Sequence, residues 1–332
     1  MSAPGQALLA VDNLSVELPH GERSVRAVDG VSLAVERGRT LAIVGESGCG
    51  KSMLCRAIKG LLPRSASLAG SGRIVLAGQD LGALAPRERR TLLGRQVGIV
   101  LQDPLSALNP VMKVGWQIAE PLQQHLGLSR AAAKARAFEL LAAVGIAQAA
   151  ARFDCYPHQL SGGMRQRIVI AIALACEPPL LIADEPTTAL DVTVQAEILT
   201  LLARLQRERN MAMILVSHNL GVVAGLAHET AVMYAGRIVE QAPTAGLFRH
   251  MRMPYTQALF DANPRLDDPA REMLKAIGGQ PPDLSDLPPG CSFAPRCPRA
   301  EARCRQELPR LDDEGSGHRC ACWFPLHRMA VA

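Results

Sequence analysis

The sequence predicts an α/β fold in which short buried strands of a parallel sheet alternate with helices. Two runs, TLAIV at 40–44 and LLIAD at 180–184, are almost wholly apolar, as strands covered on both faces are. Residues 194–205 place apolar side chains at a spacing of 4-3-4, which makes one apolar helix face, and a further strand is predicted at 211–216. Strand, helix and strand in this order are typical of an α/β domain.

The N-terminal region shows the different pattern of half-buried strands. Apolar side chains alternate with polar ones in two stretches, at Leu14, Val16 and Leu18 and again at Val31, Leu33 and Val35. Alternation with a period of two puts one face of a strand against a core and the other in water. We therefore expect an N-terminal β subdomain.

The strand at 40–44 runs into GESGCGKS, which has the spacing GxxxxGK[ST]. In this pattern the backbone N–H groups of a glycine-rich turn point at the β-phosphate of a nucleotide, and the following helix adds its positive N-terminus. Lys51 is expected to reach the β- and γ-phosphates and Ser52 to bind Mg²⁺. A chance glycine turn is the alternative, and the flanking strand and predicted helix at 52–58 argue against it. The candidate binding residues are Gly45, Glu46, Ser47, Gly48, Cys49, Gly50, Lys51 and Ser52.

The strand at 180–184 ends in two carboxylates, Asp184 and Glu185. Asp184 is expected to join the magnesium shell, and Glu185 to orient or deprotonate an attacking water. Taken alone, the motif is equally consistent with a strand that ends in two solvated acids. Its place after a phosphate-binding loop favours the catalytic interpretation.

A second glycine motif, LSGGM at 160–164, precedes a helix predicted over 164–175. Ser161, Gly162 and Gly163 there predict a second anion site at a helix N-terminus. An alanine- and leucine-rich helix is predicted over 131–144, with Ser129 as its N-cap and Gly145 as its stop.

Composition limits the function classes. The chain has 332 residues, 48% of them hydrophobic, and a net charge of +5 without a concentrated basic stripe, so we expect a globular protein that does not bind nucleic acid. No run is long and apolar enough for a membrane span. The first residues lack the basic start and apolar core of a signal peptide, which predicts a cytosolic protein.

Five of the nine cysteines lie near the C-terminus, after a segment at 278–290 that is rich in proline and glycine and is predicted to be an extended linker into a separate tail. In a cytosolic protein such clustering indicates a metal site rather than disulfides. The spacing lacks the CxxC pairs usual for structural zinc. An iron–sulfur centre, zinc and free thiols all stay open at this point.

The combination of GESGCGKS, Gln102, LSGGM, LLIADE, the triplet 189–191 and His218 resembles the ATP-binding-cassette (ABC) ATPases in order and spacing over about residues 7–241. The resemblance implies a P-loop NTPase cassette with a RecA-like core, an N-terminal antiparallel β subdomain and an α-helical subdomain at about 104–175. It also implies that Gln102 senses Mg²⁺ and the attacking water, that Asp191 is the D-loop aspartate, and that His218 contacts the γ-phosphate.

In the resembled family, LSGGM closes over the ATP held by a partner chain, so that each active site is shared by a head-to-tail pair. The resemblance then narrows to the peptide and nickel importer branch, on QDPLSALNPVMKVGWQIAEP at 102–121, SGGMRQR, ADEPTTALDVTVQ, SHNLGVVA, MYAGRIVEQA and PYTQAL. It implies a second homologous ATPase subunit, two transmembrane permeases that dock near Asn109, Pro110, Val111 and Trp116, and an extracytoplasmic binding protein. The chain would lie peripherally on the cytoplasmic face of the plasma (inner) membrane.

One departure from the family concerns the adenine base. The family stacks adenine on an aromatic residue before the P-loop, but residues 1–115 contain no Phe, Tyr or Trp, and Leu18 stands near that place. Arg23, Arg26 and Val28 follow. Either an arginine stacks on the base or the contact is merely apolar.

In some importers of this branch a similar cysteine tail holds a [4Fe-4S] cluster, and the matching positions here are Cys291, Cys297, Cys304 and Cys322, with Cys320 as an extra. We assign residues 1–255 to the ATPase domain and 256–332 to the linker and Cys-rich C-terminal domain. The main hypothesis is the ATP-hydrolysing subunit of a di- or oligopeptide importer. A nickel importer and an ABC ATPase without a transporter are the alternatives.

Overall fold

The computed structural model describes residues 7–21, 23–188, 190–262, 277–313 and 317–326. The chain divides into two compact units. The first contains residues 1–9, 34–39 and 75–216, and the second contains 10–33, 40–74 and 217–332. Among the described helices, none combines the length and the apolar character needed to cross a membrane.

Three parallel strands form the centre of the first unit: β7 (Val97–Val100), β8 (Leu180–Asp184) and β9 (Ala212–Val216). Strand β8 pairs with both neighbours, and Ile182 lies opposite Ile99 and Ile214. All residues of β8 and β9 are buried, which confirms the buried strands that the apolar runs predicted. Parallel strands bring their C-terminal ends to one edge of a sheet, so the residues after β7 and β8 share that edge.

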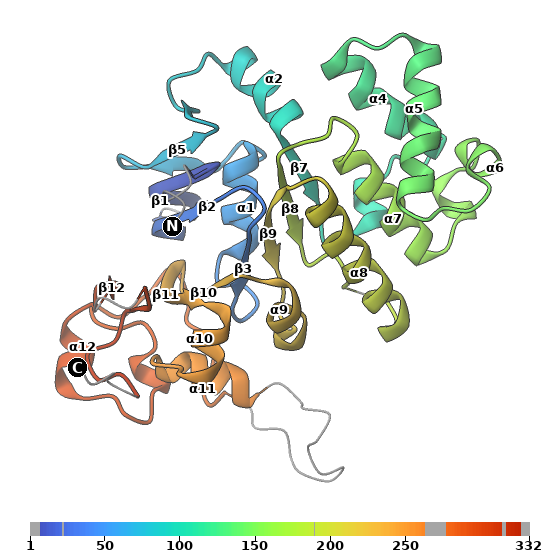
Figure 1. The fold of residues 1–332 in the computed structure, drawn as a ribbon. Helices are drawn as coiled ribbons and strands as arrows, with labels where there is room; N and C mark the ends of the chain where they lie inside the picture. The colour runs from blue at the N-terminus through green and yellow to red at the C-terminus, as the bar shows by residue number, and fades with distance from the viewer. Residues whose placement is uncertain (1–6, 22, 189, 263–276, 314–316, 327–332) are drawn as a thin grey trace, which may run out of the picture. The chain divides into compact units, whose positions relative to one another are not determined.

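Helices make up most of the rest of the first unit, and α4 to α7 gather beside the strands (Figure 1). Helix α5 begins after Ser129, whose hydroxyl accepts a hydrogen bond from the Ala132 N–H at 3.3 Å. It ends before Gly145, which has a φ of +77°, so both predicted helix signals are confirmed. The helices are α2 (Pro86–Gln96), α3 (Pro104–Ala107), α4 (Val114–Leu126), α5 (Arg130–Ala143), α6 (Ala149–Phe153), α7 (Gly162–Ala173) and α8 (Val192–Glu208), with a 3₁₀ turn at Pro157–Gln159.

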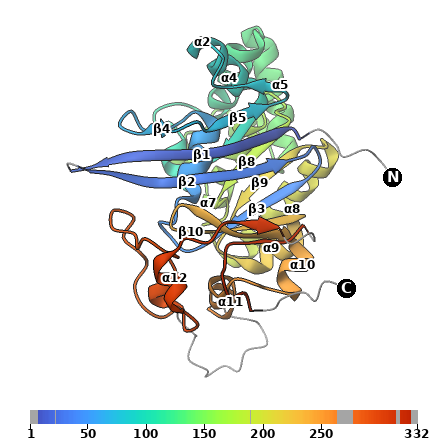
Figure 2. The ribbon, with the colours of Figure 1, turned by 90° about the vertical axis from the view of Figure 1, so that its left-hand side faces the viewer.

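Two long strands, β1 (Leu9–His20) and β2 (Arg23–Val35), run side by side and belong almost entirely to the second unit (Figure 2). Strand β4 (Ser67–Ala69) pairs antiparallel with β1. In the first unit, Val75 and Leu76 of β5 (Arg73–Leu76) pair antiparallel with β6 (Gln79–Asp80). The alternating residues Leu14 and Val16 are buried in β1, as the period-two pattern predicted.

The second unit also contains strand β3 (Thr40–Val44). Strand β3 pairs parallel with β10 (Glu229–Tyr234), which pairs antiparallel with β11 (Arg237–Pro243). Two short strands from the C-terminal region, β13 (Arg319–Cys320) and β12 (Asp312–Asp313), extend this sheet beyond β11. The helices of the unit are α1 (Lys51–Lys59), α9 (Leu220–Leu226), α10 (Thr244–Arg249), α11 (Pro254–Asp261) and α12 (Ala302–Gln306), with a 3₁₀ turn at Ala294–Arg296.

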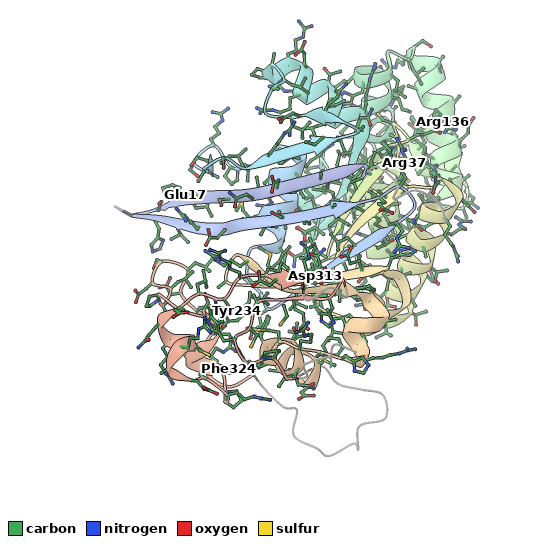
Figure 3. The ribbon with its side chains drawn as sticks, turned by 60° about the vertical axis from the view of Figure 1, so that its left-hand side comes forward. Glu17, Arg37, Arg136, Tyr234, Asp313 and Phe324 are labelled. Carbon is green, nitrogen blue, oxygen red and sulfur yellow. The ribbon has the colours of Figure 1, made fainter. Side chains whose placement is uncertain are left out.

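One hydrophobic core of the second unit joins the strand before the phosphate loop to the cysteine-bearing segment, by which we mean residues 291–313 and 317–322. The core contains Val44, Tyr234, Tyr255 and Phe293, and three of the C-terminal cysteines pack against it. The Tyr234 and Tyr255 rings lie 4.4 Å apart, and Phe293 lies within 5.4 Å of each. Figure 3 labels Tyr234 on β10 and Phe324 near the C-terminus of the same unit. The predicted boundary at residue 255 stays a prediction, but the cysteine-bearing segment is packed onto the unit of the phosphate loop.

Candidate functional site

The phosphate loop follows the fully buried strand β3 and ends in helix α1, in the order that the motif predicted. Gly45 and Gly50 have φ angles of +153° and +105°, and a Cβ would come within 2.2 Å of the Met233 carbonyl oxygen at Gly45 and 2.1 Å of the Ala27 carbonyl oxygen at Gly50. Both contacts are with backbone, so neither can relax by a rotamer change. The turn therefore requires glycine at both positions.

Lys51 lies inside the loop. Its side chain is almost fully buried, and Nζ donates hydrogen bonds of 2.8 Å to the carbonyl oxygens of Gly45 and Glu46. Cys49 is buried as well, and burial raises the pKa of its thiol, so the thiol is protonated at neutral pH. The loop thus presents an ammonium group and no thiolate. Ser52 occupies the first turn of α1.

His218 belongs to the same unit as the phosphate loop. Its neighbour Ser217 donates its N–H to the Ile43 carbonyl of β3 at 3.3 Å, which places His218 beside the strand that leads into the loop. Asn219 then caps α9, because its Oδ1 accepts from the N–H groups of Gly221 and Val222. The His218 side chain is exposed.

The first unit holds the predicted catalytic carboxylates. Asp184, the last residue of β8, is 2% exposed. Glu185 follows, and its Oε2 accepts hydrogen bonds from Gln102 Nε2 at 2.8 Å and from Thr188 Oγ1 at 3.0 Å. Gln102 follows β7, so the shared edge of the parallel strands brings Gln102 and Glu185 together. Thr188 is a contact that the sequence did not single out.

The backbone of Glu185 is unusual. Its φ is +47°, in the left-handed region that residues other than glycine rarely adopt, and its N–H donates to the Val216 carbonyl at 3.1 Å. A non-glycine residue held in this region costs on the order of 1–3 kcal/mol, and such positions cluster at functional sites. With this backbone conformation the chain turns directly after β8, and the turn sets the position of the Glu185 side chain.

LSGGM and the aspartate at 191 both form helix N-termini in the first unit. Ser161 caps α7, with its Oγ accepting from the Met164 N–H at 3.3 Å, so the helix begins two residues before the predicted start. Asp191 caps α8 by accepting from the Val194 N–H at 2.9 Å. A Cβ on Gly163 would lie 2.8 Å from Val194 Cγ1, so the two N-termini are close neighbours. Ser161, Gly162 and Asp191 are exposed.

In the region expected to contact the adenine base, the guanidinium of Arg26 is already paired with carboxylates. Arg26 forms ion pairs with Glu17 at 3.0 Å and Asp29 at 3.5 Å. The hydrogen bond that Arg26 donates to Glu17 is the main cause that raises the pKa of Arg26. Leu18 is half-buried, and the side chain of Arg23 lies outside the described part of the chain.

Glu46 has partners that the sequence did not indicate. Its N–H donates to the Tyr255 hydroxyl at 2.8 Å, and its carboxylate is bound by both terminal nitrogens of Arg296 at 2.7 and 2.9 Å. Arg296 lies 250 residues away in the cysteine-bearing segment, so no local pattern could have revealed the pair. The glutamate hydrogen bond is the main cause that raises the pKa of Arg296, and burial raises that of Tyr255.

Four cysteines of the tail share one small cavity, which is also lined by Phe293 and Trp323; they are Cys291, Cys297, Cys304 and Cys322. Cys320 is instead part of β13, opposite Glu240 of β11. Burial raises the pKa of Cys322 to about 11, and the other three thiols add to the effect. Burial likewise raises the pKa of Cys291 and Cys297.

Within the described ranges, no group of three or more His, Cys, Asp or Glu side chains is arranged to hold a single metal ion. A [4Fe-4S] cube makes a different demand, because each thiolate binds its own iron atom and the four sulfurs need not converge on one point. Four thiols around one cavity are the donor set that such a cluster takes, so these residues fit the group.

Comparison with known proteins shows the family of the chain. Residues 28–188 match the family described as "ABC transporter", and residues 239–304 match "Oligopeptide/dipeptide transporter, C-terminal region". The chain is 47% identical to the dipeptide transport ATP-binding protein DppD of Escherichia coli over 96% of this chain and 97% of that protein. It is 45% identical to the oligopeptide transport ATP-binding protein OppD of Salmonella typhimurium, over 98% and 96%.

Solved structures agree as well. The ATP-binding cassette MJ0796, solved as a dimer bound to ADP and Pi, superposes with a TM-score of 0.64 at 26% identity, covering 71% of this chain and 98% of that one. CbiO1 from Clostridium perfringens, part of an ABC transporter complex, gives 0.62 at 29% identity, covering 73% and 91%. The cassette fold and the predicted resemblance are confirmed. The chain belongs to the ABC transporter ATP-binding proteins, in the branch of the dipeptide and oligopeptide transport ATP-binding proteins.

Proposed function

We propose that this chain is the ATP-hydrolysing, energy-coupling subunit of a multi-subunit importer for dipeptides or oligopeptides. Its membership of the family supports the proposal, as do relatives named for dipeptide and oligopeptide transport. The observation that carries the catalytic part is Glu185. It follows the buried Asp184, has a strained backbone, and its carboxylate is held by Gln102 and Thr188.

In the proposed reaction, the backbone N–H groups of residues 45–52 bind the phosphates of ATP and Lys51 binds the β- and γ-phosphates. Lys51 would exchange its hydrogen bonds to two loop carbonyls for the phosphate oxygens. The hydroxyl of Ser52, the carboxylate of Asp184 and the amide oxygen of Gln102 are hard oxygen donors that suit Mg²⁺. When bound, Mg²⁺ would neutralise charge on the phosphates.

Glu185 is the proposed general base. A glutamate in this role takes a proton from the attacking water, while Gln102 orients that water and His218 contacts the γ-phosphate. The hydrogen bond from Gln102 Nε2 to the Glu185 carboxylate supports this assignment, because it joins the residue that would position the water to the residue that would deprotonate it.

The exposed N-termini of α7 and α8 are proposed to face a partner chain. Ser161, Gly162, Gly163 and Asp191 would there bind the ATP held by the partner's phosphate loop. We propose that the partner is a second, homologous ATPase subunit and that closure of the pair drives two permeases, with an extracytoplasmic binding protein that selects the peptide. The chain would then sit on the cytoplasmic face of the membrane.

The four cysteines around the cavity are proposed to hold a [4Fe-4S] cluster. The donor set and its shared cavity support the proposal. Because burial raises the pKa of three of the thiols, they are protonated before the metal binds, and binding would release protons.

The proposal is tested by transport in a defined system. The chain, its partner ATPase and the two permeases are reconstituted in liposomes with the binding protein, and uptake of a labelled dipeptide and release of phosphate are measured together. We expect uptake that depends on ATP and hydrolysis that rises with loaded binding protein. Hydrolysis without uptake of any di- or oligopeptide would contradict the assigned substrate class.

A further inference from the structure

We infer that Arg296 is a positioning residue for nucleotide binding: through Glu46 it fixes the phosphate loop, so that the fold of the cysteine-bearing segment sets the affinity of the chain for ATP. The inference rests on the proposed role of residues 45–52 in binding ATP. Arg296, Glu46 and the loop all belong to the second unit.

The Arg296 guanidinium is held on several sides. Its two terminal nitrogens bind the two carboxylate oxygens of Glu46, and the Arg296 side chain is 5% exposed and that of Glu46 20%. Nε donates to the Gly278 carbonyl at 2.8 Å, and the terminal nitrogens also donate to the Tyr234 hydroxyl and the Ile277 carbonyl at 3.3 Å. A planar guanidinium that binds both carboxylate oxygens fixes direction as well as distance.

Glu46 is consequently fixed at three points. The Tyr255 hydroxyl accepts from its N–H, Lys51 Nζ donates to its carbonyl oxygen, and Arg296 binds its carboxylate. The carbonyl of Glu46 is one of the two groups that hold the Lys51 ammonium. A shift of Glu46 therefore changes where the lysine is held before it exchanges this hydrogen bond for the β- and γ-phosphates.

Loss of Arg296 has a second, electrostatic consequence. The Glu46 carboxylate would remain in the phosphate loop without its cation, and a negative charge there opposes the binding of a triphosphate. Arg296 ends the 3₁₀ turn directly before Cys297, which lines the cysteine cavity. A rearrangement of the cysteine-bearing segment thus reaches the phosphate loop through one ion pair.

The test measures the Kd of the full-length chain for Mg·ATP by calorimetry, in the wild type and in four variants. For Arg296→Ala we expect a Kd raised about tenfold, because one partner of a largely buried ion pair is left uncompensated. Arg296→Lys keeps the charge but loses the second hydrogen bond, and its Kd should lie between those of the wild type and Arg296→Ala. If Arg296→Ala does not fold, the Kd of Arg296→Lys alone decides whether the inference holds.

Two further variants separate positioning from simple damage to the fold. In Glu46→Ala/Arg296→Ala the unpaired carboxylate is gone, so the Kd should recover at least threefold from that of Arg296→Ala. Arg305→Ala removes an exposed cation of the same segment and should leave the Kd unchanged. In the assembled transporter, Arg296→Ala should raise the KM for ATP by a larger factor than it lowers kcat.

A Kd of Arg296→Ala, or of Arg296→Lys where that variant decides, within twofold of the wild type would overturn the inference, and so would an equal loss in Arg305→Ala or a double variant no better than Arg296→Ala. These outcomes leave the proposed ATP site intact. A wild-type chain that does not bind ATP at all would instead refute the site itself.

Discussion

At the scale of single residues, the effect of the negative charge of Glu185 can be measured separately from the effect of its side-chain shape. Glutamine has nearly the same shape as glutamate and can adopt the same backbone, but it cannot accept a proton at neutral pH. A Glu185 variant can therefore keep the site's geometry while losing only its base.

We predict that Glu185→Gln in the assembled transporter keeps ATP binding and loses turnover by a factor of about 10² to 10⁴, the usual cost of one proton-transfer group. Equilibrium binding and steady-state phosphate release measure the two quantities. Glu177→Gln is a matched control, because Glu177 also has a positive φ and lies on the surface, paired with Arg136. Near wild-type hydrolysis by Glu185→Gln would refute the assignment.

The missing aromatic side chain is also a matter of single residues. Stacking on an aromatic ring contributes on the order of 1–3 kcal/mol per base, and residues 1–115 contain no Phe, Tyr or Trp. Arg26 is engaged by Glu17 and Asp29, which leaves its guanidinium less available for a base.

We predict weak discrimination between ATP and GTP, to be measured as two dissociation constants under the same conditions. The phosphates supply most of the binding and are identical in the two nucleotides. A preference for ATP above about a hundredfold, or about 2.7 kcal/mol, would show that a base-specific contact exists.

At the scale of elements, the cysteine-bearing segment distributes its thiols between two environments. Four cysteines line the cavity, whereas Cys320 lies in β13 and is tied to β11 by strand pairing. A substitution in the first group removes a proposed ligand, and a substitution at Cys320 removes a sulfur from a strand.

We predict that the chain, when it is purified without oxygen, contains about four iron atoms per chain and absorbs near 400 nm, as thiolate-bound clusters do. Cys304→Ser should lose the iron, and Cys320→Ser should retain it. Iron and acid-labile sulfide, measured against protein concentration, decide the matter. Stoichiometric zinc without iron would contradict the cluster. Loss of iron from Cys320→Ser together with retention of iron in Cys322→Ser would show that Cys320, and not Cys322, is the fourth ligand.

At the scale of the whole molecule, the proposed catalytic residues are divided between the two units of the chain. The phosphate loop and His218 belong to one unit, and Gln102, Glu185 and LSGGM belong to the other. Exposure of Ser161, Gly162 and Asp191 at the N-termini of α7 and α8 is what a site completed by a second chain would require.

We predict that the isolated chain hydrolyses ATP slowly and that the partner ATPase and permeases together stimulate it. The measurement is phosphate release per chain as a function of dilution, with and without the other subunits. If the diluted chain alone is as active as the full complex, sites shared between chains are excluded.

Sequence reasoning succeeded where the information is local. Apolar runs located β3 and β8, motif spacing located the loop and the carboxylates, and Ser129 and Gly145 marked the ends of α5. It missed the contact of Arg296 with Glu46, which lies beside the packed rings of Tyr234, Tyr255 and Phe293, since Arg296 donates to the Tyr234 hydroxyl and the Glu46 N–H donates to that of Tyr255. Such packing joins segments far apart in the chain, and no periodicity in one segment records its partner in another.

The short strand β13 has a consequence for the behaviour of the chain in solution. By pairing with Glu240 and Gln241 it covers part of the outer side of β11. An uncovered strand offers its N–H and C=O groups to any other extended chain, which is how sheets from separate molecules join into aggregates. A chain shortened before residue 312 would lack β13 and would leave the backbone groups of β11 at Glu240 and Gln241 open to such pairing.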